Sequence, residues 1–220
     1  MPETWSMFFP LLFGGTALLA WGLGAGNPPL DFIAAAVLAV ALLVLNFFRD
    51  FERKPSRPLG PREVLSPADG KVVVLTRAVE EFHLKKKAVH IAIFMNPLNN
   101  HVQRVPFNAR VVKKVYHPGK FLAAYDDKAD LVNEQCHLVM NLAGGKGFKP
   151  PGRAVVKQIA GLLCRRVKTD PEPGAVLARG GRFGRILLGS RVDLFLPKGF
   201  KPSVKMGDQV RAGVTVLGEF

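Results

Sequence analysis

Cysteine is scarce in this sequence, with only Cys136 and Cys164 among 220 residues. Two cysteines are too few for a small secreted fold held together by disulfides, and their spacing is not the C-x-x-C pattern of zinc or redox sites. Hydrophobic residues make up 48% of the chain, and this fraction excludes intrinsic disorder. The chain is therefore predicted to fold and to work in a reducing compartment.

Basic residues are missing from the first 48 positions, although the whole chain has 31 of them and a formal net charge of +14. The charged residues there are Glu3 and Asp31 alone. Residues 4–30 carry no charge, and residues 32–48 contain a single polar side chain, Asn46. Each stretch is long and apolar enough to enter a bilayer.

A helical hairpin is predicted over residues 1–48, because a segment rich in glycine and proline at 24–29 separates the two apolar stretches. A cleaved signal peptide is the alternative interpretation. It would need a cationic region before the apolar run, and Met1–Thr4 supplies none.

A basic, proline-containing segment, residues 49–62, follows the hairpin directly and is interpreted as a juxtamembrane linker. Positive residues next to a membrane segment mark its cytoplasmic end, so residues 63–220 are predicted to lie on the cytoplasmic side of the cell membrane. Each Lys or Arg of this domain that lies near the bilayer surface would contribute about 1 kcal/mol of electrostatic attraction to anionic lipid headgroups. Nucleic acid is not expected as a partner, because the basic residues are scattered and not interleaved with aromatic side chains.

From residue 63 onward, short β-rich runs alternate with glycine and proline. This texture predicts a mainly β (α+β) fold, a sandwich or partly open barrel that follows the helical hairpin. One short helix is expected at Ala123–Asn133. The expected strands are Lys71–Val79, Ala88–Met95, Arg110–Tyr116, Gln135–Leu142, Ala154–Val167, Arg185–Leu196 and Val214–Leu217.

Residues 204–213 look like the G-D-x-V-x-x-G turn of biotinyl and lipoyl-like barrel-sandwich domains, and Pro67–Val74 looks like its partner half. This likeness supports a barrel-sandwich-like fold more than a function. It leaves open a membrane-anchored carrier or adaptor module. Such a module would need a coiled-coil insertion or a modified lysine at the turn, where this chain has Met206.

Gly189 and Ser190 interrupt a strand pattern that runs from Arg185 to Leu196. On its own, a Gly-Ser pair is typical of a turn or bulge. It also permits self-cleavage, because glycine can adopt a strained conformation that exposes its carbonyl to the hydroxyl of the next residue. An N-to-O acyl shift, β-elimination and loss of ammonia would leave a pyruvoyl group on the new N-terminus, and its ketone can form a Schiff base.

Several segments in a fixed order resemble the short form of the pyruvoyl-dependent phosphatidylserine decarboxylases. Leu188–Ser190 is similar to the processing motif of that family, and residues 191–197 are similar to the sequence that follows it. The other similar segments are an Asp-bearing turn at Ser66–Val72, a His-bearing segment from Phe94 to Pro106, and a block made of Pro118–Phe121, Asp127–Ala129 and Asn133–Glu134.

The resemblance implies a membrane-anchored proenzyme that cuts itself between Gly189 and Ser190. The products would be a β chain, residues 1–189, and an α chain, residues 190–220, which carries a covalent pyruvoyl group derived from Ser190. The phospholipid substrate would be phosphatidylserine, which yields phosphatidylethanolamine and carbon dioxide. An archaetidylserine-type decarboxylase is also compatible, because the headgroup chemistry is shared and the lipid tails leave no mark in the sequence.

The resemblance also implies roles for individual side chains. Asp69 would orient a histidine, and His101 would be the base that takes the proton from Ser190. Longer members of the family have two histidines in an H-x-x-H pattern, whereas here His101 is followed by Arg104. Arg104 and Arg191 are candidates for substrate binding, because a guanidinium suits a phosphodiester or a carboxylate.

No metal site is predicted. The remaining histidines show no ligand spacing such as H-E-x-x-H, which favours core or surface positions for His83, His90, His117 and His137. The decarboxylation chemistry implied by the resemblance needs no metal ion either.

Overall fold

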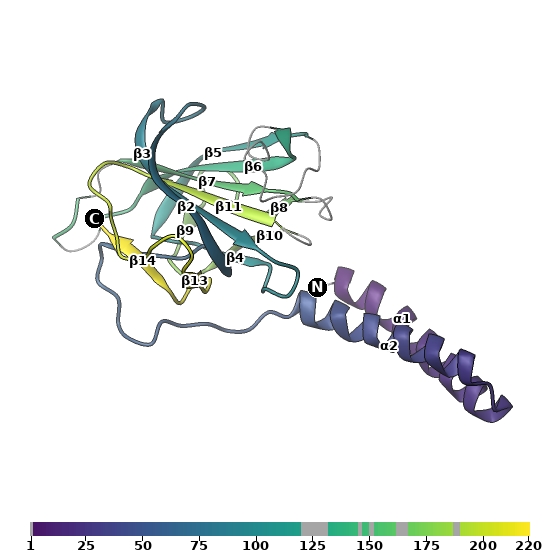
Figure 1. Cartoon of the computed structure of the whole chain (residues 1–220). Coiled ribbons are helices and arrows are strands. Elements are labelled where there is room, and N and C mark those ends of the chain that lie inside the picture. Colours follow the sequence, from purple (N-terminus) through teal and green to yellow (C-terminus); the bar gives the residue numbers. More distant parts are fainter. Residues whose placement is uncertain (1, 120–131, 145–146, 150–151, 162–166, 187–189) are drawn as a thin grey trace. The chain divides into compact units, whose positions relative to one another are not determined.

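The computed structural model describes residues 2–119, 132–144, 147–149, 152–161, 167–186 and 190–220. The chain divides into two compact units, Met1–Asp50 and Phe51–Phe220. The described part of the first unit is helical, and that of the second is rich in β-strands (Figure 1). The predicted fold class, a β domain preceded by two apolar helices, is therefore confirmed.

Helix α1 spans Pro2–Ala25 and helix α2 spans Pro28–Phe48. The side chain of Asn27 caps α2, because it accepts a hydrogen bond from the backbone N–H of Leu30 at 3.4 Å. Two prolines occupy the first turn of α2, where the backbone N–H has no helical acceptor to lose. The predicted break between two helices is found at this turn.

The two helices approach each other at small residues. A Cβ on Gly15 would come within 2.9 Å of the Leu38 side chain, so glycine permits the close packing. Large apolar side chains point outward with exposed fractions of 65% or more, namely those of Phe13, Trp21, Leu23, Phe32 and Leu42. Both helices are long and apolar enough to cross a membrane. Their exposed apolar surface suggests membrane association.

The described strands of the second unit form antiparallel sheets. The largest has the order β13-β2-β3-β11-β7-β6-β5-β9, and two smaller sheets have the orders β1-β14-β12 and β4-β10-β8. The strands are β1 (Glu63–Leu65), β2 (Gly70–Glu80), β3 (Lys86–Met95), β4 (Val102–Arg104), β5 (Ala109–His117), β6 (Gln135–Leu142), β7 (Arg153–Ile159), β8 (Val167–Thr169), β9 (Val176–Leu177), β10 (Arg182–Ile186), β11 (Ser190–Leu196), β12 (Lys201–Pro202), β13 (Gln209–Val210) and β14 (Val216–Glu219).

The large sheet curls into a half-barrel (Figure 1). Irregularities in the ladder help it to curl, because a bulge bends the strand and increases its local twist. One lies in β2 between Val72 and Val74, and another lies in β5 between Val111 and Lys113.

Strand β11 is central in this sheet, and each of its residues is buried. Successive residues of a strand point to opposite faces. Val192 and Leu194 belong to the main hydrophobic core, whereas Phe195 packs in a smaller cluster. Ser190 therefore shares the face of the main core, and Arg191 lies on the opposite face.

The two segments that look like barrel-sandwich halves pair with each other. Gln209 of β13 lies opposite Lys71 of β2, and Val210 lies opposite Gly70. The backbone N–H of Val72 also donates to the Asp208 carbonyl at 2.9 Å. The C-terminal turn is thus joined to the start of β2, as the sequence pattern suggests.

Two of the expected strands are wrong in their extent. The strand expected at Ala154–Val167 ends at Ile159, and β8 then begins in a different sheet. The strand expected at Arg185–Leu196 is in fact two strands, β10 and β11, which also lie in different sheets. An apolar run does not reveal where the chain leaves one sheet for another. The helix expected at Ala123–Asn133 lies almost entirely outside the described residues.

Candidate active site

Ser190 is the first residue of β11, which is paired with β3 on one side and with β7 on the other. Its backbone lies opposite Met95, the last residue of β3, and its hydroxyl is 3.5 Å from the Met95 Sδ atom. The residue is completely buried. Gly189, the other half of the predicted cleavage site, lies outside the described residues. The structure thus holds the Ser190 hydroxyl in one place and away from bulk water.

Three strand ends meet around Ser190. Strand β3 ends here, β11 begins here, and β2 begins at Gly70, directly after Asp69. Gly70 has a φ of +150°, and a Cβ at this position would lie 2.0 Å from the Phe94 carbonyl oxygen, so the close approach requires glycine. Asp69 and Ser190 therefore lie at the same end of the large sheet, on either side of β3.

His101 lies between β3 and β4 and is completely buried. Its Nδ1 atom is 2.8 Å from the carbonyl oxygen of Asn99, and because a carbonyl can only accept, Nδ1 carries the proton. Nε2 is then the basic nitrogen of the ring. The His101 carbonyl accepts a hydrogen bond from the backbone N–H of Ile186, the last described residue before Gly189. His101 is thus bonded to the strand that leads toward the predicted cleavage site.

Two buried glutamines connect His101 with the sheet beside Ser190. The Gln103 amide donates to the His101 carbonyl at 2.9 Å and lies 3.7 Å from the sulfur of Met95, which also contacts Ser190. The Gln158 amide donates in turn to the Gln103 side-chain oxygen at 3.0 Å. Neither glutamine has any exposed surface. This network holds the backbone at His101 in a fixed position relative to Ser190.

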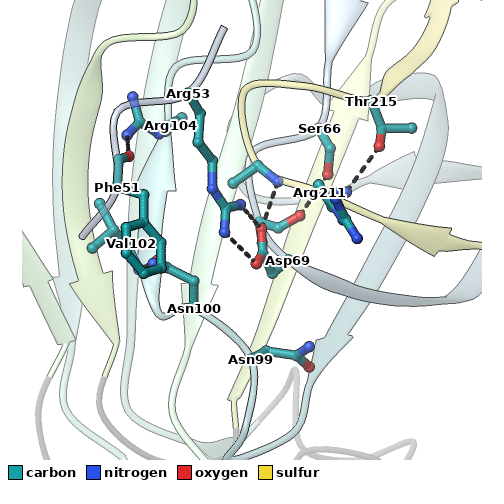
Figure 2. A network of polar contacts seen from close by, with 12 residues as sticks. Phe51, Arg53, Ser66, Asp69, Asn99, Asn100, Val102, Arg104, Arg211 and Thr215 are labelled. Atoms are coloured by element: carbon teal, nitrogen blue, oxygen red, sulfur yellow. Dashed lines mark hydrogen bonds and ion pairs between the residues drawn. The ribbon is translucent and has the colours of Figure 1, made fainter. Parts of the chain in front are cut away.

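Asp69 is largely buried, and its carboxylate binds two partners. Arg53 forms an ion pair with both carboxylate oxygens, with Nη2 at 3.0 Å from Oδ2 (Figure 2). The backbone N–H of Ala212 donates to Oδ1 at 2.7 Å. Asp69 therefore joins the basic segment 49–62 to the C-terminal strands, and its orientation of His101 stays a prediction.

Arg104 lines a cavity of about 520 Å³. Its guanidinium donates to the carbonyl oxygen of Phe51 at 2.6 Å (Figure 2). It also donates to the carbonyl oxygen of Gly180 at 3.0 Å. Glu52 also lines this cavity, but cationic side chains outnumber it, namely those of Arg53, Lys54, Arg57, Arg104, Arg179 and Arg182. A lining of this charge suits an anionic group, which is the kind of ligand predicted for Arg104.

Arg191 forms an ion pair with Asp193 on the face of the sheet opposite the Ser190 side chain. Its Nε and Nη2 atoms donate to the two carboxylate oxygens of Asp193 at 2.6 and 2.8 Å, and His90 Nε2 lies 2.8 Å from the same carboxylate. Burial alone would raise the pKa of Asp193, but the His90 hydrogen bond and the Arg191 charge hold it below its usual range. The predicted contact of Arg191 with substrate stays a prediction.

Known proteins similar to this chain distinguish the decarboxylase interpretation from the carrier interpretation. Residues 40–218 match the model of a family described as phosphatidylserine decarboxylase. The chain belongs to this family. Asp69, His101 and Ser190 lie within the matched range, and the match confirms the resemblance to phosphatidylserine decarboxylases seen in the sequence.

Curated phosphatidylserine decarboxylases resemble the chain over most of their length. A phosphatidylserine decarboxylase proenzyme of Geotalea uraniireducens is 43% identical over 202 residues, which cover 92% of this chain and 86% of that protein. A protein of the same name from Geobacter metallireducens is 39% identical over 212 residues, covering 96% and 93%. Another, from Nitrosomonas eutropha, is 43% identical over 181 residues, covering 82% and 80%.

The structure adds residues to the candidate site that the sequence did not reveal. Asn99 contributes a backbone carbonyl, which no side-chain pattern can mark. Gln158 offered a weak signal, since it is a polar residue within the strand expected at Ala154–Val167, whereas Gln103 lies in a three-residue strand that the sequence does not mark. Arg53 had no signal, because its partner Asp69 is sixteen residues away and outside the same element.

Proposed function

We propose that this member of the family is a phosphatidylserine decarboxylase proenzyme that cuts itself between Gly189 and Ser190. The observation that carries the proposal is the buried Ser190 hydroxyl at the start of β11, together with the buried His101, whose Nδ1 faces the Asn99 carbonyl and whose Nε2 is therefore the basic nitrogen. The names of the relatives support it, since a proenzyme is a precursor that must be processed.

The fold can hold both products of such a cut. The α chain, residues 190–220, begins with β11, whose seven residues pair with β3 and five of which also pair with β7. Its later strands are paired with the β chain as well, β13 with β2 and β14 with β1. The described cross-strand hydrogen bonds therefore keep the two chains in one domain after cleavage.

In the first step, the Ser190 hydroxyl attacks the Gly189 carbonyl carbon while His101 Nε2 accepts the hydroxyl proton. His101 returns this proton to the Ser190 nitrogen, which leaves the carbonyl carbon as an amine, so that an ester replaces the amide. Loss of the Cα proton then expels residues 1–189 as a carboxylate. Water finally replaces the nitrogen, which departs as ammonia, and a pyruvoyl group remains on residue 190.

The surroundings of Ser190 fit a pyruvoyl group, because Met95 and the main hydrophobic core exclude water from its small side chain. When present, the ketone supplies an electrophile for the substrate amine and a sink for the electrons of the breaking bond to the carboxylate. His101 is the candidate donor of the proton that replaces carbon dioxide. The arginine-lined cavity next to Arg104 would hold the phosphate of the headgroup.

The helices explain how such a site would reach a lipid substrate. We place α1 and α2 in the cell membrane and the second unit on the cytoplasmic side, because all 31 basic residues follow residue 48. The anchor would raise the local concentration of the domain at the bilayer, where phosphatidylserine resides.

Asp69→Asn is expected to leave most of the protein uncut, with cleavage slowed by at least about tenfold, because a neutral amide cannot stabilise the His101 cation that forms as Ser190 is deprotonated. Denaturing gels at timed intervals after synthesis measure the effect. Arg53→Gln is the matched control, since it removes the ion-pair partner and keeps the carboxylate. Arg53→Gln should cut at the normal rate. Equal loss of cleavage in both variants would show that Asp69 serves only to bind Arg53.

Deletion of residues 1–48 is expected to leave self-cleavage intact, because the candidate site lies entirely in the second unit. Activity on phosphatidylserine in vesicles should fall strongly, whereas activity on a short-chain or detergent-dispersed substrate should survive. Residual binding to anionic vesicles should weaken with added salt, since it depends on screened charge attraction. Equal vesicle activity with and without residues 1–48 at every salt concentration would contradict the proposed role of the helices.

A further inference from the structure

Three histidines that are far apart in the sequence converge on one face of the large sheet. His83 lies in the turn between β2 and β3, His117 ends β5, and His137 lies in β6. Val115 is paired with His137, so His117 is the diagonal neighbour of His137 on the same face. One ring nitrogen from each histidine lies within 4.8 Å of the others.

The hydrogen bonds of His137 prepare it to be a ligand. Its Nε2 atom is 2.7 Å from the Gln135 side-chain oxygen, which can only accept, so Nε2 carries the proton. Nδ1 of His137 therefore presents a lone pair, and it faces His83 Nε2 at 2.9 Å. Metal-binding histidines commonly donate their second ring N–H to such an oxygen, which fixes the tautomer and the ring orientation.

His117 completes the cluster. Its Nε2 atom is buried and has no hydrogen-bond partner among the described residues. Its ring centroid lies 4.5 Å from that of His137. A buried ring nitrogen without a partner is costly, and a bound cation would remove that cost.

Burial favours neutral imidazoles in this cluster, the form that binds metals. Burial, assisted by the positive charge of Lys157, lowers the pKa of His137 to about 3. Burial also lowers the pKa of His83, against the opposing effect of Glu80. The Glu80 carboxylate lies 3.0 Å from Lys157 Nζ and accepts hydrogen bonds from the His83 and Leu84 backbone, so it offsets the nearby positive charge.

We propose that His83, His117 and His137 form a binding site for one Zn²⁺ ion. Three imidazole nitrogens with water in the fourth position are an established zinc arrangement, with Zn–N distances of about 2.0–2.1 Å. On binding, His83 moves its proton from Nε2 to Nδ1, so that no net proton is released by this ring. The ion would tie the β2–β3 turn to β5 and β6.

This site is separate from the decarboxylase site. His137 is paired with Lys157, and Lys157 is paired with Asp193, so this row of residues lies on the face of the sheet opposite Val192 and Ser190. His83 also borders a cavity of about 430 Å³, which neither His117 nor His137 lines. The ion would therefore take no part in decarboxylation.

The test uses the full-length protein, purified in detergent, stripped with a chelator and dialysed first against ZnCl₂ and then against metal-free buffer. Elemental analysis should find one zinc per chain, and added zinc should raise the melting temperature by several degrees. Co²⁺ in place of zinc should give the visible absorption bands of a four-coordinate ion with nitrogen ligands.

His83→Ala and His117→Ala should lose the bound zinc and the thermal shift, and Gln135→Ala should bind zinc about 10–100-fold more weakly. His83 and His117 are only partly buried, so these variants should fold, which their metal-free melting temperatures will check. Tyr116→Phe, next to His117 but exposed, is the matched control and should keep the zinc. Zinc-free wild-type protein, or equal zinc in His117→Ala and wild type, would overturn the proposal and leave the cluster as packing alone.

Discussion

Ser190→Ala is expected to yield a single uncut chain with no decarboxylase activity. Alanine removes the hydroxyl that would attack Gly189, and without the resulting ester no β-elimination can follow and no pyruvoyl group can form, so both functions should be lost completely. The substitution is small, and among the described residues the partner of the Ser190 hydroxyl is the Met95 sulfur at 3.5 Å, a weak contact, so the fold should be preserved. Denaturing gels and an assay for released carbon dioxide measure the two effects.

Ser203→Ala is the matched control for this experiment, because Ser203 is an exposed serine of the same α chain. It should cut and decarboxylate like the wild type. Cleavage of Ser190→Ala at the normal rate would place the processing site elsewhere in the chain.

His101→Ala is expected to slow self-cleavage by about 10²–10⁴-fold, the usual contribution of a positioned general base. The structure supports this size of effect, because His101 is completely buried and its tautomer is set by the Asn99 carbonyl at 2.8 Å. Arg104, three positions after His101, cannot replace it as a base, because its guanidinium stays protonated at neutral pH. Timed gels give the cleavage rate, and melting curves check that the variant is folded.

A second readout separates the two steps assigned to His101. The small fraction of His101→Ala that does become cut should still be impaired in decarboxylation, when activity is expressed per cut chain. If the variant instead cuts at the wild-type rate and fails only in decarboxylation, another group is the base for processing. Normal rates in both steps would remove His101 from the mechanism.

The parts of the fold that the sequence predicted are those with a long, regular pattern. The apolar runs on either side of residues 24–29 correctly indicated two helices, and β-rich runs between glycines and prolines indicated the long strands β2, β3 and β6. Strands of two or three residues, such as β4 and β8, have too few positions to show a period. They were missed, although β4 follows His101 directly.

The candidate site was predictable only where a motif names the residue. Leu188–Ser190 and the Asp-bearing turn mark Ser190 and Asp69, but the acceptor for His101 is a backbone oxygen, which any residue at position 99 could provide. The three-histidine cluster was hidden for a different reason. Its members come from separate strands and a turn, so their proximity depends on the register of β5 with β6 and on the path of the β2–β3 hairpin.

The central claim is self-processing at Ser190, and the intact mass of the purified full-length protein tests it most directly. The account predicts two chains, one of residues 1–189 and one of residues 190–220, the second lighter by one ammonia than a fragment that begins with serine. A reagent that reacts with ketones should label the second chain alone. A single intact chain of 220 residues in a preparation that decarboxylates phosphatidylserine would contradict the account.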